Sequence, residues 1–519
     1  MESAAGAIVL LEKSSRMRRI AILGVTALAL WILLGLVLPA ELPFNNDQNS
    51  YLGGAAALRV GHGYRLEQYI GLPRIGIYPP GFSIWLAMFW KEGQPFAVNS
   101  YRLVVANWIA AGCALFALAA CLLVSELPLW VSAAFLALFG TSVIFTQLTA
   151  WLMADVLFMA GSCVLALLVA AYNPQGKVSA WWIAAGLLTG ALYLIKIAAI
   201  AYIIGLGAFG LLKGDLRRFS RFVYFALPTF SVIVLWFLFT RDVPTYGTQF
   251  TARLSAMKSW TEYPLRALKQ AGLYYSGRWL VEAMLNIPDR LSGARPFLRI
   301  SFAAEALAFL LGFVFAVPIF LGIRKGAKHP REQITLFILG AVAIQLLVWP
   351  FYLGARGGIV VLPFLINWLS RGINSKAAKA AFLSLLVVNI PGNVWLSYKT
   401  LLDEETKSTQ SLAALRQAAS WINETGGVSA SVAAGRDVPL IHLHEYLGRR
   451  VLAHAAPIGG GRSSDVRHNA QSGQWPDYVI TDRSFDPWRW DPTRYLVHRV
   501  FGKWTVATPR REAFGQARP

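Results

Sequence analysis

The chain has 519 residues, of which 56% are hydrophobic and only 14% are charged, and its mean hydropathy is +0.49. Soluble domains average about 25% charged residues, so this composition excludes an ordinary soluble protein and predicts a polytopic membrane protein. The formal net charge of +21 is explained by basic loops between spans, and no basic stripe interleaved with aromatic residues indicates binding of nucleic acid.

Apolar runs long enough to cross a lipid bilayer recur along the chain. A crossing by a helix needs about 17 to 25 predominantly apolar residues. The run at 181–212 is interrupted by Lys196 and is expected to form two shorter segments, and another short segment is expected at 359–370. We therefore predict an all-α membrane domain with about eleven spans. The longer runs are 20–38, 101–124, 129–148, 153–172, 222–240, 301–323, 333–353 and 379–397.

The orientation of the chain follows from its lysines and arginines. They cluster at 13–19, 213–221, 324–331 and 370–379. Short cytoplasmic loops carry an excess of these residues, so the four segments are predicted to share the cytoplasmic face. The N-terminus is then inside and the C-terminus outside. The first apolar run follows basic residues, as in a signal peptide, but its length of about 19 residues favours a retained anchor.

Three segments between or after the apolar runs are predicted to build the outer face: 39–100, 241–300 and 401–519. In the first of them, the residues after Asp47 have helical spacing of apolar side chains, which makes Asp47 a candidate N-cap. Pro79 and Pro80 are expected to form an extended corner before the chain returns to the membrane. We expect residues 1–400 to form the membrane domain with its two outer loops.

Residues 401–519 are predicted to form a small α/β domain. SLAALRQAASWINET reads as an amphipathic helix, and VSASVAA, PDYVITD and HRVFGKWTVATP read as short strands. The segment LIHLHEYL also reads as a strand, which would place His442 and His444 on one face. No third ligand is suitably spaced, so no metal site is predicted there.

Four charged residues lie within or beside apolar runs, where an ionised side chain is costly and indicates a function. They are Asp47, Asp155, Lys196 and Arg356. On the predicted topology all four lie near the outer ends of their spans, so we expect them to converge on one cavity. Each acid also has a purely structural alternative, because an Asp at the start of a helix often serves only as its cap.

The order of several short motifs resembles that of the GT-C glycosyltransferases, a class of integral membrane enzymes that includes protein O-mannosyltransferases and the aminoarabinose transferase of lipid A. The motifs are NNDQNSYLGGAAALRVGHGY, GIYPPGF, TQLTAWLMADVLFMAG, GLLTGALYLIKIAAI and FYLGARGGIVVLPFLINWL. The likeness extends over residues 15–400 in layout. This chain has Tyr78 where some relatives have lysine or histidine, a single Asp47 after Asn46, and Lys196 where arginine is usual.

The resemblance implies transfer of a sugar from a polyprenyl-phosphate donor to a glycan, lipid or protein acceptor at the outer face of a cytoplasmic membrane. Displacing a phosphate at the anomeric carbon needs a base for the acceptor and cations for the leaving group. Asp47 would be the base and the reaction would invert the anomeric centre. Asp155 would orient the acceptor or a basic residue, or raise the pKa of Asp47 through the proximity of two like charges. Lys196 and Arg356 would bind the donor phosphate.

The remaining assignments are less specific. Pro79 and Pro80 are expected to shape the loop, and Tyr78 is expected either to stack on a sugar or to pack at the interface. No cofactor is predicted, and the few acidic residues neither require nor exclude a divalent cation. Two other functions fit the composition: a secondary transporter with Asp155 and Lys196 as an ion relay, and a glycan-binding assembly subunit without turnover.

Overall fold

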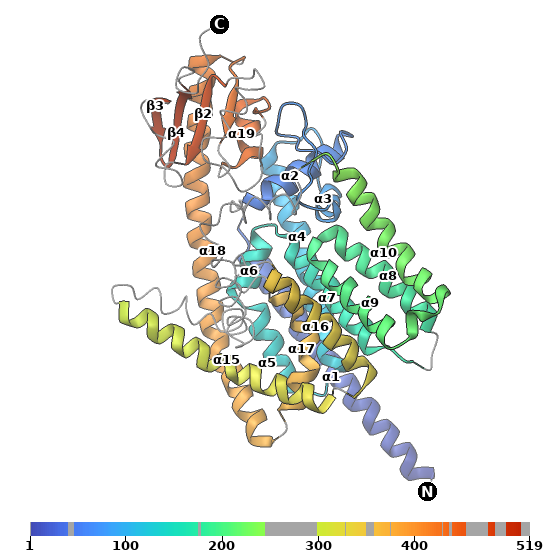
Figure 1. Cartoon of the computed structure of the whole chain (residues 1–519). Coiled ribbons are helices and arrows are strands. Elements are labelled where there is room, and N and C mark those ends of the chain that lie inside the picture. Colours follow the sequence, from blue (N-terminus) through green and yellow to red (C-terminus); the bar gives the residue numbers. More distant parts are fainter. Residues whose placement is uncertain are drawn as a thin grey trace.

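Helices dominate the fold, and a small sheet lies near the C-terminus (Figure 1). The computed structural model describes residues 2–39, 46–174, 178–243, 298–326, 328–348, 358–373, 375–427, 429–434, 438–452, 476–482 and 495–509.

The first part of the chain is α1 (Glu2–Val37), α2 (Asn46–Arg59), α3 (Gly81–Ala87), α4 (Phe96–Val124), α5 (Leu129–Gly140), α6 (Val143–Ala150) and α7 (Ala154–Ala170). The second part is α8 (Val178–Ile195), η1 (Ile197–Ala199), α9 (Ile200–Leu212), η2 (Asp215–Arg217), α10 (Phe219–Thr240), α15 (Leu298–Gly326), α16 (Pro330–Val348), η4 (Ile359–Val361), α17 (Leu362–Gly372), α18 (Lys376–Gly426) and α19 (Leu440–Leu447).

Long apolar helices make this a multi-pass membrane protein. Within the described residues, four helices are long and apolar enough to cross a membrane, and the pair α5 and α6, bent by 47°, raises the number to as many as five. Shorter apolar helices include α7, α8 and α9. The break expected at Lys196 is confirmed, because α8 ends at Ile195 and η1 begins at Ile197. The total of about eleven spans stays a prediction.

The longest helix joins two elements that the sequence suggested were separate. α18 is continuous over 51 residues, from the apolar run near 379–397 to the end of the tail helix. The intervening stretch LLDEETKSTQ contains no glycine or proline and is rich in good helix formers, so nothing interrupts the hydrogen-bond ladder there. Figure 1 shows this helix connecting the membrane part to the C-terminal sheet.

The C-terminal sheet contains the predicted strands. They are β1 (Val432–Ala434), β2 (Tyr478–Asp482), β3 (Tyr495–Phe501) and β4 (Trp504–Pro509), in the order β1-β2-β4-β3. β1 is parallel to β2, whereas β2 and β3 both pair antiparallel with β4.

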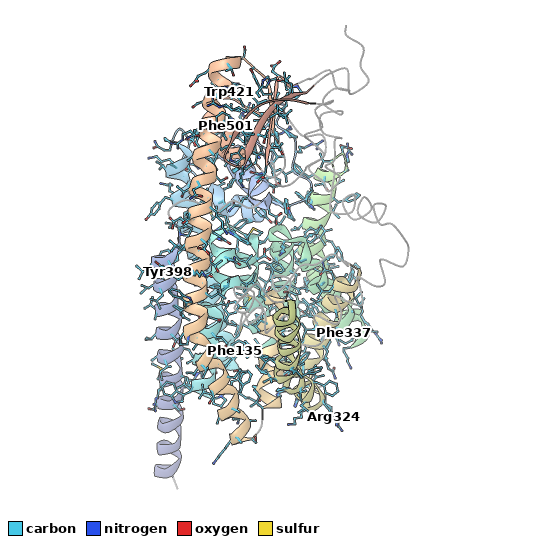
Figure 2. All side chains as sticks on the ribbon, turned by 90° about the vertical axis from the view of Figure 1, so that its left-hand side faces the viewer. Phe135, Arg324, Phe337, Tyr398, Trp421 and Phe501 are labelled. Atoms are coloured by element: carbon cyan, nitrogen blue, oxygen red, sulfur yellow. The ribbon has the colours of Figure 1, made fainter. Side chains whose placement is uncertain are left out.

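The sheet packs against the upper part of α18. The buried indole of Trp504 donates its N–H to the Ser411 carbonyl at 2.7 Å. Trp421 and Phe501 lie together at the same end of the molecule, with ring centroids 6.2 Å apart (Figure 2). We call this end, which carries β1–β4, the sheet end; Arg324 lies at the opposite end in Figure 2.

The strand prediction for LIHLHEYL is wrong, because these residues form α19. Leu440, Ile441, Leu443 and Leu447 are all buried, and their spacing places them on one face of a helix. The alternation of the two histidines was a weaker signal than this apolar pattern.

Residues 438–452, which include α19, dock on the segment between α2 and α3. The Ile70 N–H donates to the Val451 carbonyl at 2.8 Å, and the Val451 N–H donates to the Gln68 carbonyl at 3.0 Å. Beside this bridge, Arg450 forms an ion pair with Glu67, whose carboxylate also lies 2.7 Å from the His62 ring.

The Glu67 interactions predict a pH dependence of stability. Burial raises the pKa of Glu67, but the hydrogen bonds of its carboxylate with His62 and Arg450 outweigh this and leave the pKa below its ordinary value. A carboxyl with a lowered pKa stabilises the fold above its unfolded-state pKa of about 4.5 and loses this contribution as the pH falls.

We expect the unfolding temperature of Glu67→Gln in detergent to fall less between pH 6 and pH 4 than that of the wild type. The exposed control Glu424→Gln should behave like the wild type, and parallel curves for all three proteins would contradict the assignment.

Candidate active site

Asp47 lies in the first turn of α2 and receives a hydrogen bond from Tyr78. The Tyr78 hydroxyl donates to Asp47 Oδ1 at 2.7 Å, and the Tyr78 ring lies 5.0 Å from that of Tyr51. The prediction that Asp47 is the N-cap is wrong, because α2 already begins at Asn46 and Asp47 lies inside its first turn. Tyr78 is therefore more than an interfacial packing residue, since its hydroxyl fixes the orientation of the carboxylate.

The Tyr-Pro-Pro-Gly corner packs closely against the end of α8. The Tyr64 hydroxyl donates to the Tyr78 carbonyl at 2.9 Å, which fixes the corner from the loop side. Pro80 is the N-cap of α3. A Cβ at Gly81 would lie 2.7 Å from the Leu194 carbonyl oxygen, so only glycine allows this approach to α8.

Lys196 and Asp155 form an ion pair at the break that follows α8. Asp155 lies in the first turn of α7 with no exposed side-chain surface, and its carboxylate accepts a hydrogen bond from the Lys196 ammonium. A carboxylate is also favoured at this position by the helix dipole. Lys196 has extended backbone between α8 and η1 and keeps 23% of its side chain exposed. Among the roles expected of Asp155, orienting a basic residue agrees with this contact, and its role in function stays a prediction.

A strained turn before α7 links this ion pair to α2. The Gln48 side-chain amide donates to the Trp151 carbonyl at 2.6 Å. Leu152 follows with a φ of +47°, a conformation that is costly for a leucine. The Trp151 indole donates to Glu404 of α18 at 2.6 Å. Asp47 and Asp155 are thus connected through the contact of Gln48 with the residues that lead into α7.

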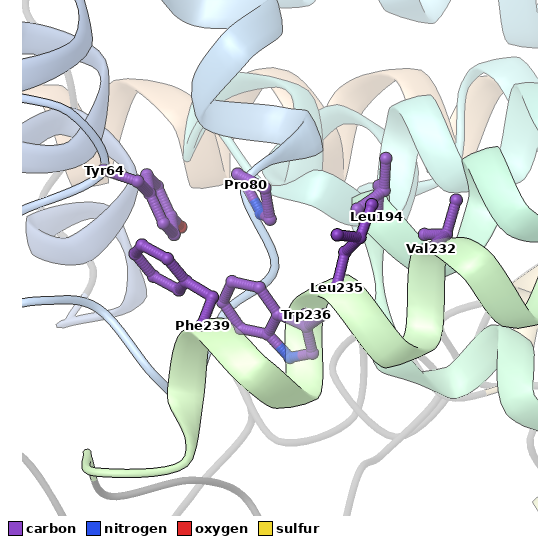
Figure 3. Close-up of a pocket in the computed structure, with 7 residues that line it drawn as sticks. All are labelled: Tyr64, Pro80, Leu194, Val232, Leu235, Trp236 and Phe239. Atoms are coloured by element: carbon purple, nitrogen blue, oxygen red, sulfur yellow. The ribbon is translucent and has the colours of Figure 1, made fainter.

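An apolar pocket is lined in part by the Tyr-Pro-Pro-Gly corner. Its volume is about 220 Å³. Figure 3 shows that side chains of α10 face Pro80 and Tyr64 across it. It is lined by Tyr64, Pro80, Leu194, Val232, Leu235, Trp236 and Phe239. The corner therefore contacts the carboxylate through Tyr78 and the pocket through Pro80.

Sequence reasoning missed several polar residues around the site. Arg74 lies beside the pocket, with its guanidinium 5.9 Å from the centre of the Phe239 ring and a hydrogen bond of 3.3 Å to the Phe239 carbonyl. Gln48 and Glu404 were also missed, because neither stands out in a polar stretch of sequence. Arg356 lies outside the described residues. Among the described residues, no group of three His, Cys, Asp or Glu side chains is placed to hold a metal ion.

Comparison with known proteins identifies the architecture. No family model matches the sequence. No curated protein matches it either. ArnT from Cupriavidus metallidurans in the apo state has the same fold, with a TM-score of 0.54 at 12% identity over 99% of this chain and 100% of that chain. The archaeal oligosaccharyltransferase AglB from Archaeoglobus fulgidus, in complex with an inhibitory peptide and a dolichol-phosphate, gives a TM-score of 0.51 at 13% identity over 96% of this chain and 75% of that chain. Both are GT-C glycosyltransferases.

This chain has the GT-C fold. The resemblance inferred from the order of short motifs is thereby confirmed, although the sequence identity is low. ArnT bound to undecaprenyl phosphate matches with a TM-score of 0.50 at 14% identity over 94% of this chain and 97% of that chain. The GT-C fold therefore accounts for both the helical membrane part and the sheet end.

Proposed function

We propose that this chain is a glycosyltransferase that moves a sugar from a polyprenyl-phosphate donor to an acceptor outside the cytoplasm. The observation that carries the proposal is the Tyr-Pro-Pro-Gly corner, which contacts a carboxylate through Tyr78 and lines an apolar pocket through Pro80. A lipid-linked sugar donor needs an apolar site for its chain, and the acceptor hydroxyl needs a base nearby. The GT-C fold supports the same class, since the similar structures include ArnT bound to undecaprenyl phosphate and AglB with a dolichol-phosphate.

The donor would place isoprene units in the apolar pocket and its phosphate near Lys196. Leu194 lines the pocket and lies two residues before Lys196, so the lipid and the cation are close along the chain. Lys196 would act on the phosphate as a point charge, and Asp155 would hold it in place. Arg356 is proposed as a second phosphate ligand on the basis of its position in the sequence.

The reaction would be a single displacement. An oxygen of the acceptor hydroxyl attacks the anomeric carbon while Asp47 accepts the hydroxyl proton. The new bond forms between the acceptor oxygen and the anomeric carbon, and the bond from that carbon to the phosphate oxygen breaks. The polyprenyl phosphate leaves with the bonding electrons, and Lys196 stabilises the negative charge that develops on it. Attack opposite to the leaving group inverts the anomeric centre.

The proposed location is the cytoplasmic membrane, with the N-terminus inside and residues 401–519 outside as a small α/β domain. The basic segments support this orientation. Figure 1 shows the N-terminus and the C-terminal sheet at opposite ends of the molecule, as this topology requires. Asp47 then lies on the side where an acceptor glycan, lipid or protein arrives.

The donor class can be tested by photocrosslinking in nanodiscs. A polyprenyl phosphate with a photoreactive group in its first isoprene units should label the wild type on residues 232–239. Val232→Trp fills the pocket and should reduce the labelling roughly tenfold, because the lost volume excludes the isoprene chain. Leu227→Trp is the matched control, since Leu227 is on the same helix and is 66% exposed. Equal labelling of the two variants would contradict a lipid site in this pocket.

A further inference from the structure

Two helices at the sheet end begin directly after a proline and receive a capping hydrogen bond from a distant part of the chain. Pro439 is the N-cap of α19 and Pro95 is the N-cap of α4, and neither provides a side-chain hydrogen bond. The first N–H groups of a helix have no partner inside the helix, so they need an acceptor from elsewhere. Here the acceptors are side chains 391 and 349 positions away in sequence.

Asn49 of α2 is the acceptor for α19. Its Oδ1 accepts from the Leu440 N–H at 3.0 Å, and its Nδ2 donates to the Val438 carbonyl at 3.1 Å. Only 7% of Asn49 is exposed, so these bonds form away from water, where an unmade hydrogen bond is costly. Asn49 thus binds the backbone on both sides of Pro439.

α19 in turn caps α4. The Glu445 carboxylate accepts from the Phe96 N–H at 2.9 Å, where the helix dipole favours a negative charge. The rings of His442 and Phe96 pack edge to face with centroids 4.5 Å apart. Together with the Glu67–Arg450 ion pair, these contacts fix residues 438–452 on the membrane part.

The same contacts determine where the first turn of α2 lies. Asn49 is two residues after Asp47, and its carbonyl accepts from the buried Gln68 amide at 2.9 Å. On the other side, Gln48 donates to the Trp151 carbonyl. The turn that carries Asp47 is therefore held between segment 438–452 and the residues that precede α7.

We propose that Asn49 is a positioning residue: by capping α19 from α2, it couples segment 438–452 to the orientation of Asp47. This inference rests on the proposed function for the role of Asp47, whereas the coupling itself rests on the contacts alone. Asn49 acts through the backbone of α2 and does not take part in the transfer. Loss of its contacts with α19 lets the first turn of α2 move, so fewer molecules hold the carboxylate in the reactive orientation.

Amide hydrogen exchange in nanodiscs tests the coupling without any substrate. In Asn49→Ala, exchange of residues 440–443 and of residues 46–52 should speed up roughly tenfold, because α19 loses its cap and the first turn of α2 loses its contact with segment 438–452. Asn49→Asp keeps the oxygen that accepts from Leu440 but replaces the donor to the Val438 carbonyl with a second acceptor, so its exchange should lie between that of the wild type and that of Asn49→Ala. Ser50→Ala, on the same turn, is the control for a change in α2 alone. Unchanged exchange in Asn49→Ala, or equal acceleration in Ser50→Ala, would overturn the coupling.

Transfer kinetics test the positioning role. Asn49→Ala should lower kcat roughly tenfold and leave the donor KM unchanged, whereas Asn49→Asp, which keeps one of the two hydrogen bonds, should lower kcat less. The pH profile should keep its wild-type shape, because Asp47 is still the base. Faster exchange with unchanged kcat would show that Asn49 caps α19 without positioning Asp47. If the wild type transferred no sugar, the proposed function would be refuted. The coupling would then still be decided by whether residues 46–52 exchange faster in Asn49→Ala than in the wild type.

Discussion

Asp47→Asn is expected to lower the rate of sugar transfer by roughly 10²- to 10⁴-fold, which is the usual contribution of a general base. The amide keeps an oxygen that can accept the Tyr78 hydroxyl, so the first turn of α2 should stay in place. What it loses is the ability to take the acceptor proton. The measurement is single-turnover transfer with saturating donor, together with donor photocrosslinking, which should remain at the wild-type level.

Asp403→Asn is a suitable control for this substitution. Asp403 is exposed on α18, so the same change of charge occurs away from the corner. Transfer by this variant should match that of the wild type. If Asp47→Asn and Asp403→Asn both transferred sugar at the wild-type rate, Asp47 would not be the base.

Lys196→Met should have the largest effect on stability. It leaves the buried Asp155 carboxylate without the ammonium that compensates its charge, and removal of one partner from a buried pair costs about 3–5 kcal/mol. The free energy of unfolding can be compared with that of the wild type by denaturant titration in detergent. We also expect transfer to fall, because the proposed phosphate cation is gone.

The double variant Asp155→Asn with Lys196→Met separates the two roles of Lys196. It removes both charges, so much of the stability should return. Transfer should remain low, because a methionine cannot stabilise the leaving phosphate. Recovery of transfer together with stability would show that Lys196 is only a structural partner of Asp155.

The sequence predicted the features that depend on local pattern. The apolar run breaks at Lys196, where a charge interrupts it, and Asp155 lies in the first turn of α7, as its place within MADVLF indicated. The strands β2, β3 and β4 followed from β-branched and aromatic residues between turns. These features need only information from residues close together in the chain.

Contacts between distant segments could not be predicted in this way. Nothing in a single sequence pairs Lys196 with Asp155, or Tyr78 with Asp47, because the pairing is set by how helices pack. Asn49 gave no signal, since an asparagine near a helix start usually serves its own helix. The strand prediction for LIHLHEYL failed because two alternating histidines were weighed above the helical spacing of the leucines.

The central claim is tested most directly by turnover of the wild-type protein in nanodiscs with a panel of radiolabelled polyprenyl-phosphate sugars and a crude cell-envelope acceptor. The readouts are release of polyprenyl phosphate and appearance of the sugar on the acceptor. We predict that one donor is consumed, with equal amounts of the two products. No release from any donor by folded protein that still crosslinks the polyprenyl phosphate would contradict the assignment as a transferase.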